Sequence, residues 1–117
     1  MENEDFKPAI EDFTKIYYNG TLIKRHVVCA ANQFHNKDDH INPIIVCGAR
    51  HWDTIMSNVV DNMDIDKSHQ HKCEQGFIDQ YGIFITREEA REIVIKNEQP
   101  LREGTPLLDI LFSENLY

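Results

Sequence analysis

Two stretches of the chain carry apolar residues at helical spacing. Over residues 52–63 the apolar positions lie three and four residues apart, which predicts an amphipathic helix packed on a sheet. Asp53 falls in the first turn of this helix, where a negative charge favours the positive end of the helix dipole. Residues 86–97 show the same spacing, and Thr86 followed by Glu89 has the pattern of a capping box. We therefore predict a helix over each of these two stretches.

The segments around these helices have the composition of β-strands. Residues 21–34 are rich in β-branched side chains, which predicts one long strand. Residues 44–49 predict the next strand, and we expect the two to pair antiparallel because they are close in sequence. Residues 76–85 predict a hairpin with its turn near residues 79–82.

The N-terminal region is open to two interpretations. Residues 8–18 place apolar side chains at helical spacing after Pro8, a residue suited to a first helical turn. The Asn19-Gly20 pair would end such a helix, but the same pair is also typical of a hairpin turn between two strands. We favour the helix. Residues 1–7 are rich in charge, and we expect them to be frayed.

The last stretch, residues 107–117, is too apolar to be a free tail. It must pack on the chain's own core or on another subunit, because so much exposed apolar surface is rare in a soluble protein. We expect it to serve as an assembly tail. The whole pattern predicts a single domain over residues 1–117 with an α+β fold, in which an antiparallel sheet carries helices packed on one face.

The charge balance limits the partners of the chain. Its formal net charge is -8 at pH 7, which opposes nucleic acid because nucleic acids are held mainly by Lys and Arg. A small anionic ligand is compatible, since a few arginines can dominate inside a pocket. No stretch approaches the roughly 20 apolar residues of a membrane span. Three cysteines without a signal-like N-terminus indicate a reducing, intracellular setting.

Two groups of residues with metal-binding or nucleophilic side chains are weak signals. His69, His71 and Cys73 are of the types that bind zinc, but a structural zinc site usually needs four ligands with a second spaced pair. We favour a solvated loop, and we predict no metal and no cofactor. Cys29 and Cys47 lie in apolar strands, where a core role as small hydrophobic residues is the better interpretation.

His51 and Asp53 are the candidate pair for acid–base catalysis of hydrolysis. The chain has no nucleophile elbow, no metal-binding motif and no Walker loop. A protein that is not an enzyme is therefore our expectation. A small intracellular phosphohydrolase that uses this pair is the alternative.

Arg50 is the strongest candidate for ligand binding. It follows a predicted buried strand and two small residues, Gly48 and Ala49, which let a ligand or another backbone approach closely. Arginine suits bidentate phosphate contacts, and Trp52 or Phe77 offers a flat surface for a purine. On spacing alone, an ordinary surface or ion-pair role for this arginine stays open.

Four segments of the chain together resemble one family. They read GARHWD, EQGFIDQYGIFITREEA, EIVIKNEQP and LFSENLY, and they cover most of residues 44–117. They resemble a family of small phage and prophage proteins that includes the first described type of Thoeris anti-defence sponge. The resemblance implies an α+β protein that assembles through dimers into hexamers in the cytoplasm of the infected bacterial host.

The resemblance also implies a function. Such a protein sequesters, without cleaving it, a cyclic ADP-ribose isomer made by the TIR enzyme of the host defence, and so blocks Thoeris immunity. Some relatives also hold cyclic di- or trinucleotides. An alternative that stays open is a protein-interaction module whose LFSENLY segment docks on a host factor, since the chain combines an acidic surface with an apolar tail.

Individual positions match residues with roles in that family. Arg50 matches a phosphate-binding arginine, Phe77 matches an aromatic residue that stacks on adenine, and Thr86 matches a polar position that faces the base. Arg102 resembles a second phosphate arginine, and Asp109 is expected to orient it across a subunit interface.

Arg25 is a further basic candidate. It lies on the first long strand that the sequence predicts. We therefore include it among the expected ligand-binding residues.

Overall fold

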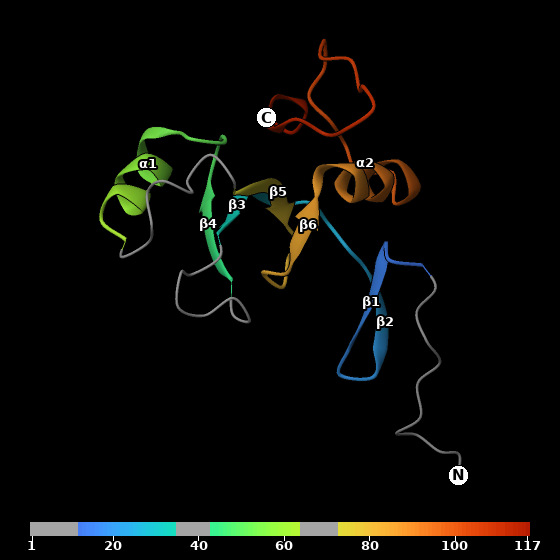
Figure 1. Ribbon diagram of the computed structural model, residues 1–117. Coiled ribbons are helices and arrows are strands. Elements are labelled where there is room, and N and C mark those ends of the chain that lie inside the picture. Colours follow the sequence, from blue (N-terminus) through green and yellow to red (C-terminus); the bar gives the residue numbers. More distant parts are fainter. Residues whose placement is uncertain (1–11, 35–42, 64–72) are drawn as a thin grey trace.

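The fold is built on a four-stranded antiparallel sheet in the order β4-β3-β5-β6, and a separate antiparallel hairpin is formed by β1 and β2 (Figure 1). The computed structural model describes residues 12–34, 43–63 and 73–117. The elements in these ranges are β1 Lys15–Tyr18, β2 Thr21–Lys24, β3 Cys29–Phe34, β4 Ile44–Gly48, α1 Thr54–Asp61, β5 Glu74–Ile78, β6 Phe84–Thr86, α2 Arg87–Lys96 and the 3-10 helix η2 Ser113–Asn115. The predicted α+β class is confirmed.

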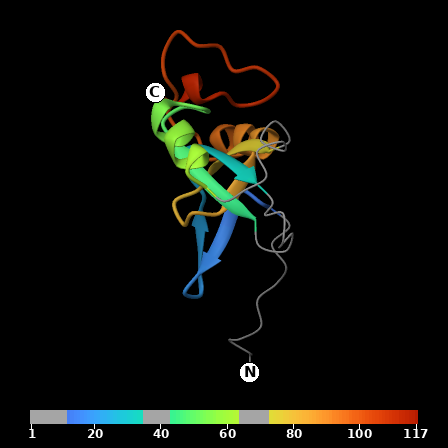
Figure 2. The same cartoon turned by 60° about the vertical axis from the view of Figure 1, so that its left-hand side comes forward.

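Both helices lie on the same face of the four-stranded sheet. Ala30 and Phe34 of β3 point to that face, because alternate residues of a strand share a side. Ala30 packs in a cluster with Ile93 of α2, and Phe34 packs in a second cluster with Met56 of α1. Figure 2 shows the two helices together on the side of the sheet away from the hairpin β1-β2. The prediction of helices on one face is therefore confirmed.

A buried amide links the two clusters. Asn32 lies between Ala30 and Phe34 on the same face of β3 and is fully buried. In the amide orientation that satisfies both neighbours, its oxygen accepts from Trp52 Nε1 at 3.2 Å and its nitrogen donates to Ala31 O at 3.1 Å. A buried polar group without partners is costly. The bond to the indole therefore both satisfies Asn32 and fixes Trp52 at the start of α1.

Side-chain caps define where the two helices begin. The carboxylate of Asp53 accepts from Met56 N at 2.8 Å, so Asp53 is the N-cap of α1 and precedes the first turn in which the sequence analysis placed it. Thr86 caps α2 and forms the predicted capping box with Glu89. Both caps satisfy main-chain N–H groups that have no partner within the helix.

The helix predicted over residues 8–18 is wrong. Over the described part of this range the chain forms β1, which pairs with β2 through a two-residue loop. Asn19 and Gly20 form the loop with φ angles of 50° and 81°. Two positive φ angles are typical of a type I′ turn, which suits Asn-Gly and matches the twist of paired strands. Turn chemistry outweighs helical spacing here, and residues 8–11 lie outside the described residues.

The single long strand predicted over residues 21–34 is also wrong, because residues 25–28 separate β2 from β3. Side chains take the place of strand partners at this break. The amide of Gln99 accepts from Val27 N at 2.9 Å and donates to Val27 O at 2.8 Å. The amide of Gln80 accepts from His26 N and donates to Lys24 O. These partners are distant in sequence, so β-branched composition does not reveal the break.

The strand pairs expected elsewhere are confirmed. β3 pairs antiparallel with β4, and β5 pairs antiparallel with β6 around a turn at residues 79–83. Gly76 is required in β5, because a Cβ there would lie 2.2 Å from Ile85 O of β6. None of the described helices is long and apolar enough to cross a membrane.

The apolar C-terminal stretch packs on the core of its own chain. Leu111 is fully buried in the cluster beneath α2, and Leu107 and Leu116 pack against that cluster. Leu108, by contrast, is 56% exposed. The sequence analysis left open whether this stretch covers its own core or another subunit. Leu111 covers the core of its own chain. Assembly through the exposed part of the stretch stays a prediction.

Asp79 organises the turn between β5 and β6. Its carboxylate accepts hydrogen bonds from Tyr81 N at 2.8 Å and from Ile83 N at 2.9 Å. It also pairs with Arg25 Nε at 2.9 Å, and the Asp79 side chain is 0% exposed. Pairing and hydrogen bonds replace the water that this charge loses on burial.

We expect Asp79→Ala to lower the free energy of unfolding by about 3–5 kcal/mol, because it leaves the Arg25 guanidinium without its buried partner. Urea denaturation measures this difference. Glu103→Ala, at an exposed position, is the control and should stay within about 0.5 kcal/mol of the wild type. An Asp79→Ala loss as small as that of the control would show that the pair does not stabilise the fold.

Candidate functional site

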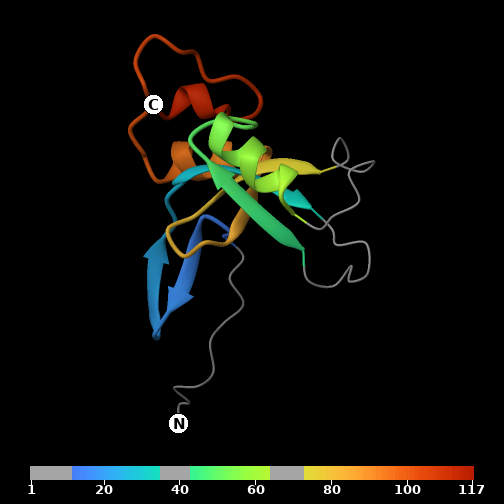
Figure 3. The ribbon, with the colours of Figure 1, turned by 90° about the vertical axis from the view of Figure 1, so that its left-hand side faces the viewer.

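The candidate site lies where the turn after β4 meets residues 112–117, which we call the C-terminal segment (Figure 3). Arg50 projects from this turn. Its Nη1 donates to Ser113 O at 3.1 Å, its Nη2 donates to the main-chain oxygen of Tyr117, and its Nε lies 3.5 Å from the Glu114 carboxylate. The guanidinium carbon also lies 4.8 Å from the centre of the Tyr117 ring. Arg50 is therefore fully engaged by the C-terminal segment.

Asp53 holds the turn that carries Arg50. Its Oδ2 accepts from Ala49 N at 2.9 Å and from Arg50 N at 3.4 Å, in addition to the bond that caps α1. The hydrogen bond from Met56 N, followed by those from Arg50 and Ala49, lowers the pKa of Asp53. This carboxylate is ionised and committed to main-chain donors, so it is not placed as a partner for His51.

Gly48 makes room for that carboxylate. A Cβ at this position would lie 2.7 Å from Asp53 Oδ1. The sequence analysis expected the small residues before Arg50 to keep space for a ligand. In the folded chain the space at Gly48 is filled by Asp53.

His51 points into the protein. Its Nε2 lies 2.7 Å from Gly76 O, and its ring meets the Phe77 ring edge-on at 5.4 Å. Burial, and then the positive charge of Arg87, lower the pKa of His51, although Gly76 and Glu114 act in the opposite direction. A neutral ring that donates its Nε2 proton to Gly76 O satisfies this geometry, so His51 has a structural partner rather than a catalytic one.

Arg87 is a further candidate site residue, one that the sequence analysis missed. It is the first residue of α2, directly after the capping Thr86. Its Nη2 donates to Gln75 Oε1 at 2.7 Å, and its guanidinium carbon lies 5.4 Å from the Phe112 ring. Its Nε is buried and has no partner among the described residues. The arginine in TREEA was visible in the sequence, but nothing in the pattern around it indicated a role in ligand binding.

Two more of the expected ligand residues are engaged within the fold. Phe77 is 0% exposed in the core beneath α2, so the free chain offers no face of this ring for stacking. Thr86 uses its hydroxyl oxygen to accept from Glu89 N at 3.1 Å. Thr86 directly precedes Arg87 in sequence, and Phe77 contacts His51.

The remaining expected residues lie apart from Arg50. Arg102 and Asp109 are exposed on the stretch that follows α2, and the described contacts join neither of them to Arg50. Arg102 contributes a main-chain bond to Asn115 O at 2.7 Å. Arg25 is paired with the buried Asp79, which makes it part of the scaffold in this structure.

The cysteines are free thiols. Cys29 is half-buried, and burial, followed by the neighbouring Cys47, raises its pKa to about 11. Cys47 is exposed, so the expected core role is wrong for Cys47, which lies on the sheet face opposite the helices. His69 and His71 lie outside the described residues, and within the described ones no group of His, Cys, Asp and Glu could hold a metal ion.

The lowered pKa of His51 predicts a pH dependence of stability. Below the ordinary value of 6.5, the unfolded chain binds a proton at His51 that the folded chain does not. The free energy of unfolding should therefore fall as the pH falls from 6.5 toward the lower folded pKa.

His51→Gln should reduce this pH dependence, because glutamine keeps a donor for Gly76 O but does not titrate. Urea denaturation at about pH 7.5 and at about pH 5.5 compares the two proteins across the histidine range. The other histidines are common to both, so the difference isolates His51. Equal losses of stability in the two proteins would contradict the assignment.

A comparison with family models gives one match, to the model described as phage T4 y16D protein, over residues 26–117. No curated protein and no solved structure matches the chain. The match includes Arg50, Arg87 and the C-terminal segment, and it leaves out Arg25 and the hairpin β1-β2. The resemblance to a phage protein family is thus confirmed, and the chain belongs to the phage T4 y16D protein family.

Proposed function

We propose that this phage protein binds and sequesters, without cleaving it, a cyclic ADP-ribose isomer made by bacterial TIR immune enzymes, and so blocks Thoeris immunity in the host cytoplasm. The observation that carries the proposal is Arg50, placed by a strand end and a capped turn in a chain of a phage protein family. Its guanidinium offers the paired donors that suit phosphate oxygens.

The geometry favours binding over catalysis. The alternative phosphohydrolase needs His51 and Asp53 as an acid–base pair. Asp53 instead accepts three main-chain N–H groups, and His51 is turned toward Gly76 O. Using them in catalysis would require opening the turn that positions Arg50.

The adenine part of the ligand needs a stacking surface. Phe77, the residue that matches this role, becomes accessible only if His51 leaves the edge of its ring. The Thr86 hydroxyl can still donate a hydrogen bond to the nucleobase, because in capping α2 it acts only as an acceptor. We propose that Arg102 and Asp109, which are exposed, complete the site of a neighbouring subunit in a dimer-based hexamer. Cyclic di- and trinucleotides are further candidate ligands.

The function is tested by the fate of the ligand. We expect cyclic ADP-ribose produced by a TIR enzyme to bind the protein and to be released chemically unchanged after heat denaturation, which chromatography of the released nucleotide measures. A linear product formed at catalytic turnover would favour the phosphohydrolase. If no cyclic ADP-ribose isomer and no cyclic di- or trinucleotide binds detectably, and the protein captures a host protein, the interaction module would be favoured.

Arg50 variants provide the control for this experiment. Arg50→Ala should weaken binding about ten- to a hundredfold, since charge-assisted hydrogen bonds contribute about 1.5–3 kcal/mol. Arg50→Lys should lose much of the affinity because a point charge does not reproduce the fork. Arg91→Ala is the matched control: its side chain is 31% exposed, against 35% for Arg50, and it also pairs with a glutamate.

Assembly has its own test. Deleting residues 107–117 would remove Leu111 from the core, so a point variant is preferable. We expect the wild type to be an oligomer by light scattering and Leu108→Asp to weaken it, because Leu108 is 56% exposed on the C-terminal stretch. Ile55→Asp, 68% exposed on α1, is the control. A monomeric wild type, or equal effects of both variants, would contradict assembly through this stretch.

A further inference from the structure

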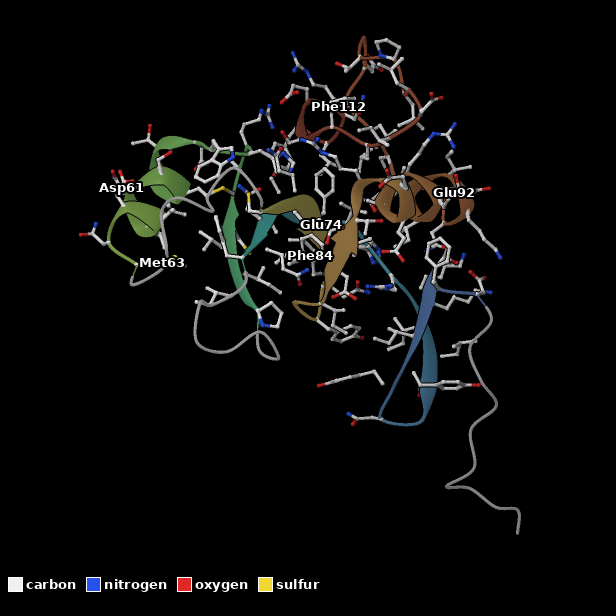
Figure 4. All side chains as sticks on the ribbon, viewed as in Figure 1. Asp61, Met63, Glu74, Phe84, Glu92 and Phe112 are labelled. Carbon is white, nitrogen blue, oxygen red and sulfur yellow. The ribbon has the colours of Figure 1, made fainter. Side chains whose placement is uncertain are left out.

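Two arginines from different elements are held by the same short stretch of chain. Arg50 comes from the turn after β4, and Arg87 from the start of α2. Each guanidinium lies over an aromatic ring of the C-terminal segment, Tyr117 for Arg50 and Phe112 for Arg87. Figure 4 shows Phe112 on the C-terminal segment, at the end of the molecule where α2 begins. The two positive charges therefore face one common segment.

The positive charge of this pair is only partly compensated. Among the described side chains, Glu114 is the single carboxylate that pairs with Arg50. Arg87 has an amide oxygen, that of Gln75, as its hydrogen-bond partner, and its buried Nε has none. The chain as a whole carries -8, so this is a local basic site on an acidic protein.

The C-terminal segment surrounds Arg50 with acceptor oxygens, as a phosphate group would. Three oxygen atoms surround the guanidinium: Ser113 O, the Tyr117 main-chain oxygen and Glu114 Oε2. The Tyr117 ring covers the guanidinium face as a nucleobase would. A diphosphate group offers at least as many acceptor oxygens and carries one more negative charge than the Glu114 carboxylate, and arginine forms bidentate hydrogen bonds with phosphate.

We propose that Arg50 and Arg87 together form a binding site for a diphosphate group, and that Glu114 and Tyr117 occupy this site in the free chain and leave when the diphosphate binds. The inference rests on the proposed function: it names Arg87 as the second phosphate-binding arginine, and Glu114 and Tyr117 as the residues that the ligand replaces.

The two side chains that must leave are both partly exposed, although the Tyr117 hydroxyl also has a hydrogen bond to the Ala30 backbone that must break. The Glu114 side chain is 54% exposed, and Tyr117 is 42% exposed. The rest of the segment is anchored independently, because Asn115 is buried and donates to Pro106 O at 3.2 Å. Leu111 stays in the core. Glu114 and Tyr117 can therefore move while the fold beneath α2 stays intact.

Inorganic pyrophosphate is the probe that tests the site, with isothermal calorimetry as the measurement. Glu114→Gln should bind it about two- to fivefold more tightly, since the exposed ion pair that competes with the ligand is lost. Arg87→Gln should bind it about tenfold more weakly or worse, since a charged donor is lost. Glu92→Gln is the matched control and should not change: Glu92 is also 54% exposed and also pairs with an arginine, and it projects from α2 well away from Phe112 (Figure 4).

Release of Tyr117 has a separate readout. The heteronuclear NOE of the Tyr117 amide should fall on addition of pyrophosphate, and it should already be lower in free Glu114→Gln, a variant at an exposed site that keeps the fold. Tighter binding by Glu114→Gln together with this fall supports the inference.

The outcomes also separate the inference from the function on which it rests. Binding of cyclic ADP-ribose with an unchanged Tyr117 signal and no effect of Glu114→Gln would overturn the inference and leave the proposed function standing. Binding of pyrophosphate with release of Tyr117, but no binding of any cyclic nucleotide, would keep the diphosphate site and overturn the sponge. No binding of either probe would overturn both.

Discussion

The carboxylate of Asp53 is the contact on which the site depends. It accepts main-chain N–H groups from Ala49 and Arg50 at the end of β4, and from Met56 in the first turn of α1. One side chain thus joins a strand, a turn and a helix, and Gly48 provides the space that it fills. The backbone donors of the turn are satisfied without water. The direction in which Arg50 leaves the sheet follows from this arrangement.

The arginines of this protein divide according to the burial of their partners. Arg25 pairs with a carboxylate that is 0% exposed, whereas the partner of Arg50 is 54% exposed. Breaking a buried pair by removing one partner costs about 3–5 kcal/mol, while an exposed pair contributes about 0–1 kcal/mol. Arg25 is therefore fixed in the scaffold, and Arg50 can exchange its partner for a ligand at small cost. This difference, rather than charge, separates Arg25, which belongs to the scaffold, from Arg50, for which we propose a binding role.

The core beneath the candidate site also limits how a ligand could bind. Phe77 is buried, and the half-buried His51 meets its ring edge-on, so stacking on Phe77 and loss of the His51–Gly76 contact are linked. Thr86 and Arg87 follow one another where β6 becomes α2. A ligand held by both arginines would thus meet the first turn of α2, the turn after β4 and the end of the chain together. The sheet order β4-β3-β5-β6 brings these three segments together.

Local chemistry could be predicted from the sequence, and long-range geometry could not. The capping box at Thr86, the amphipathic helix after Asp53 and the β5-β6 hairpin each follow from residues a few positions apart. The break in the long strand depends on amides 54 and 72 residues away, and periodicity carries no such information. For the same reason Arg50 could be predicted as a candidate binding residue, while its contact with Tyr117, 67 positions away, could not be predicted. The sequence determined which side chains have the chemistry to bind an anion, and the tertiary structure decided which of them meet, because that depends on pairs that only folding brings within hydrogen-bonding distance.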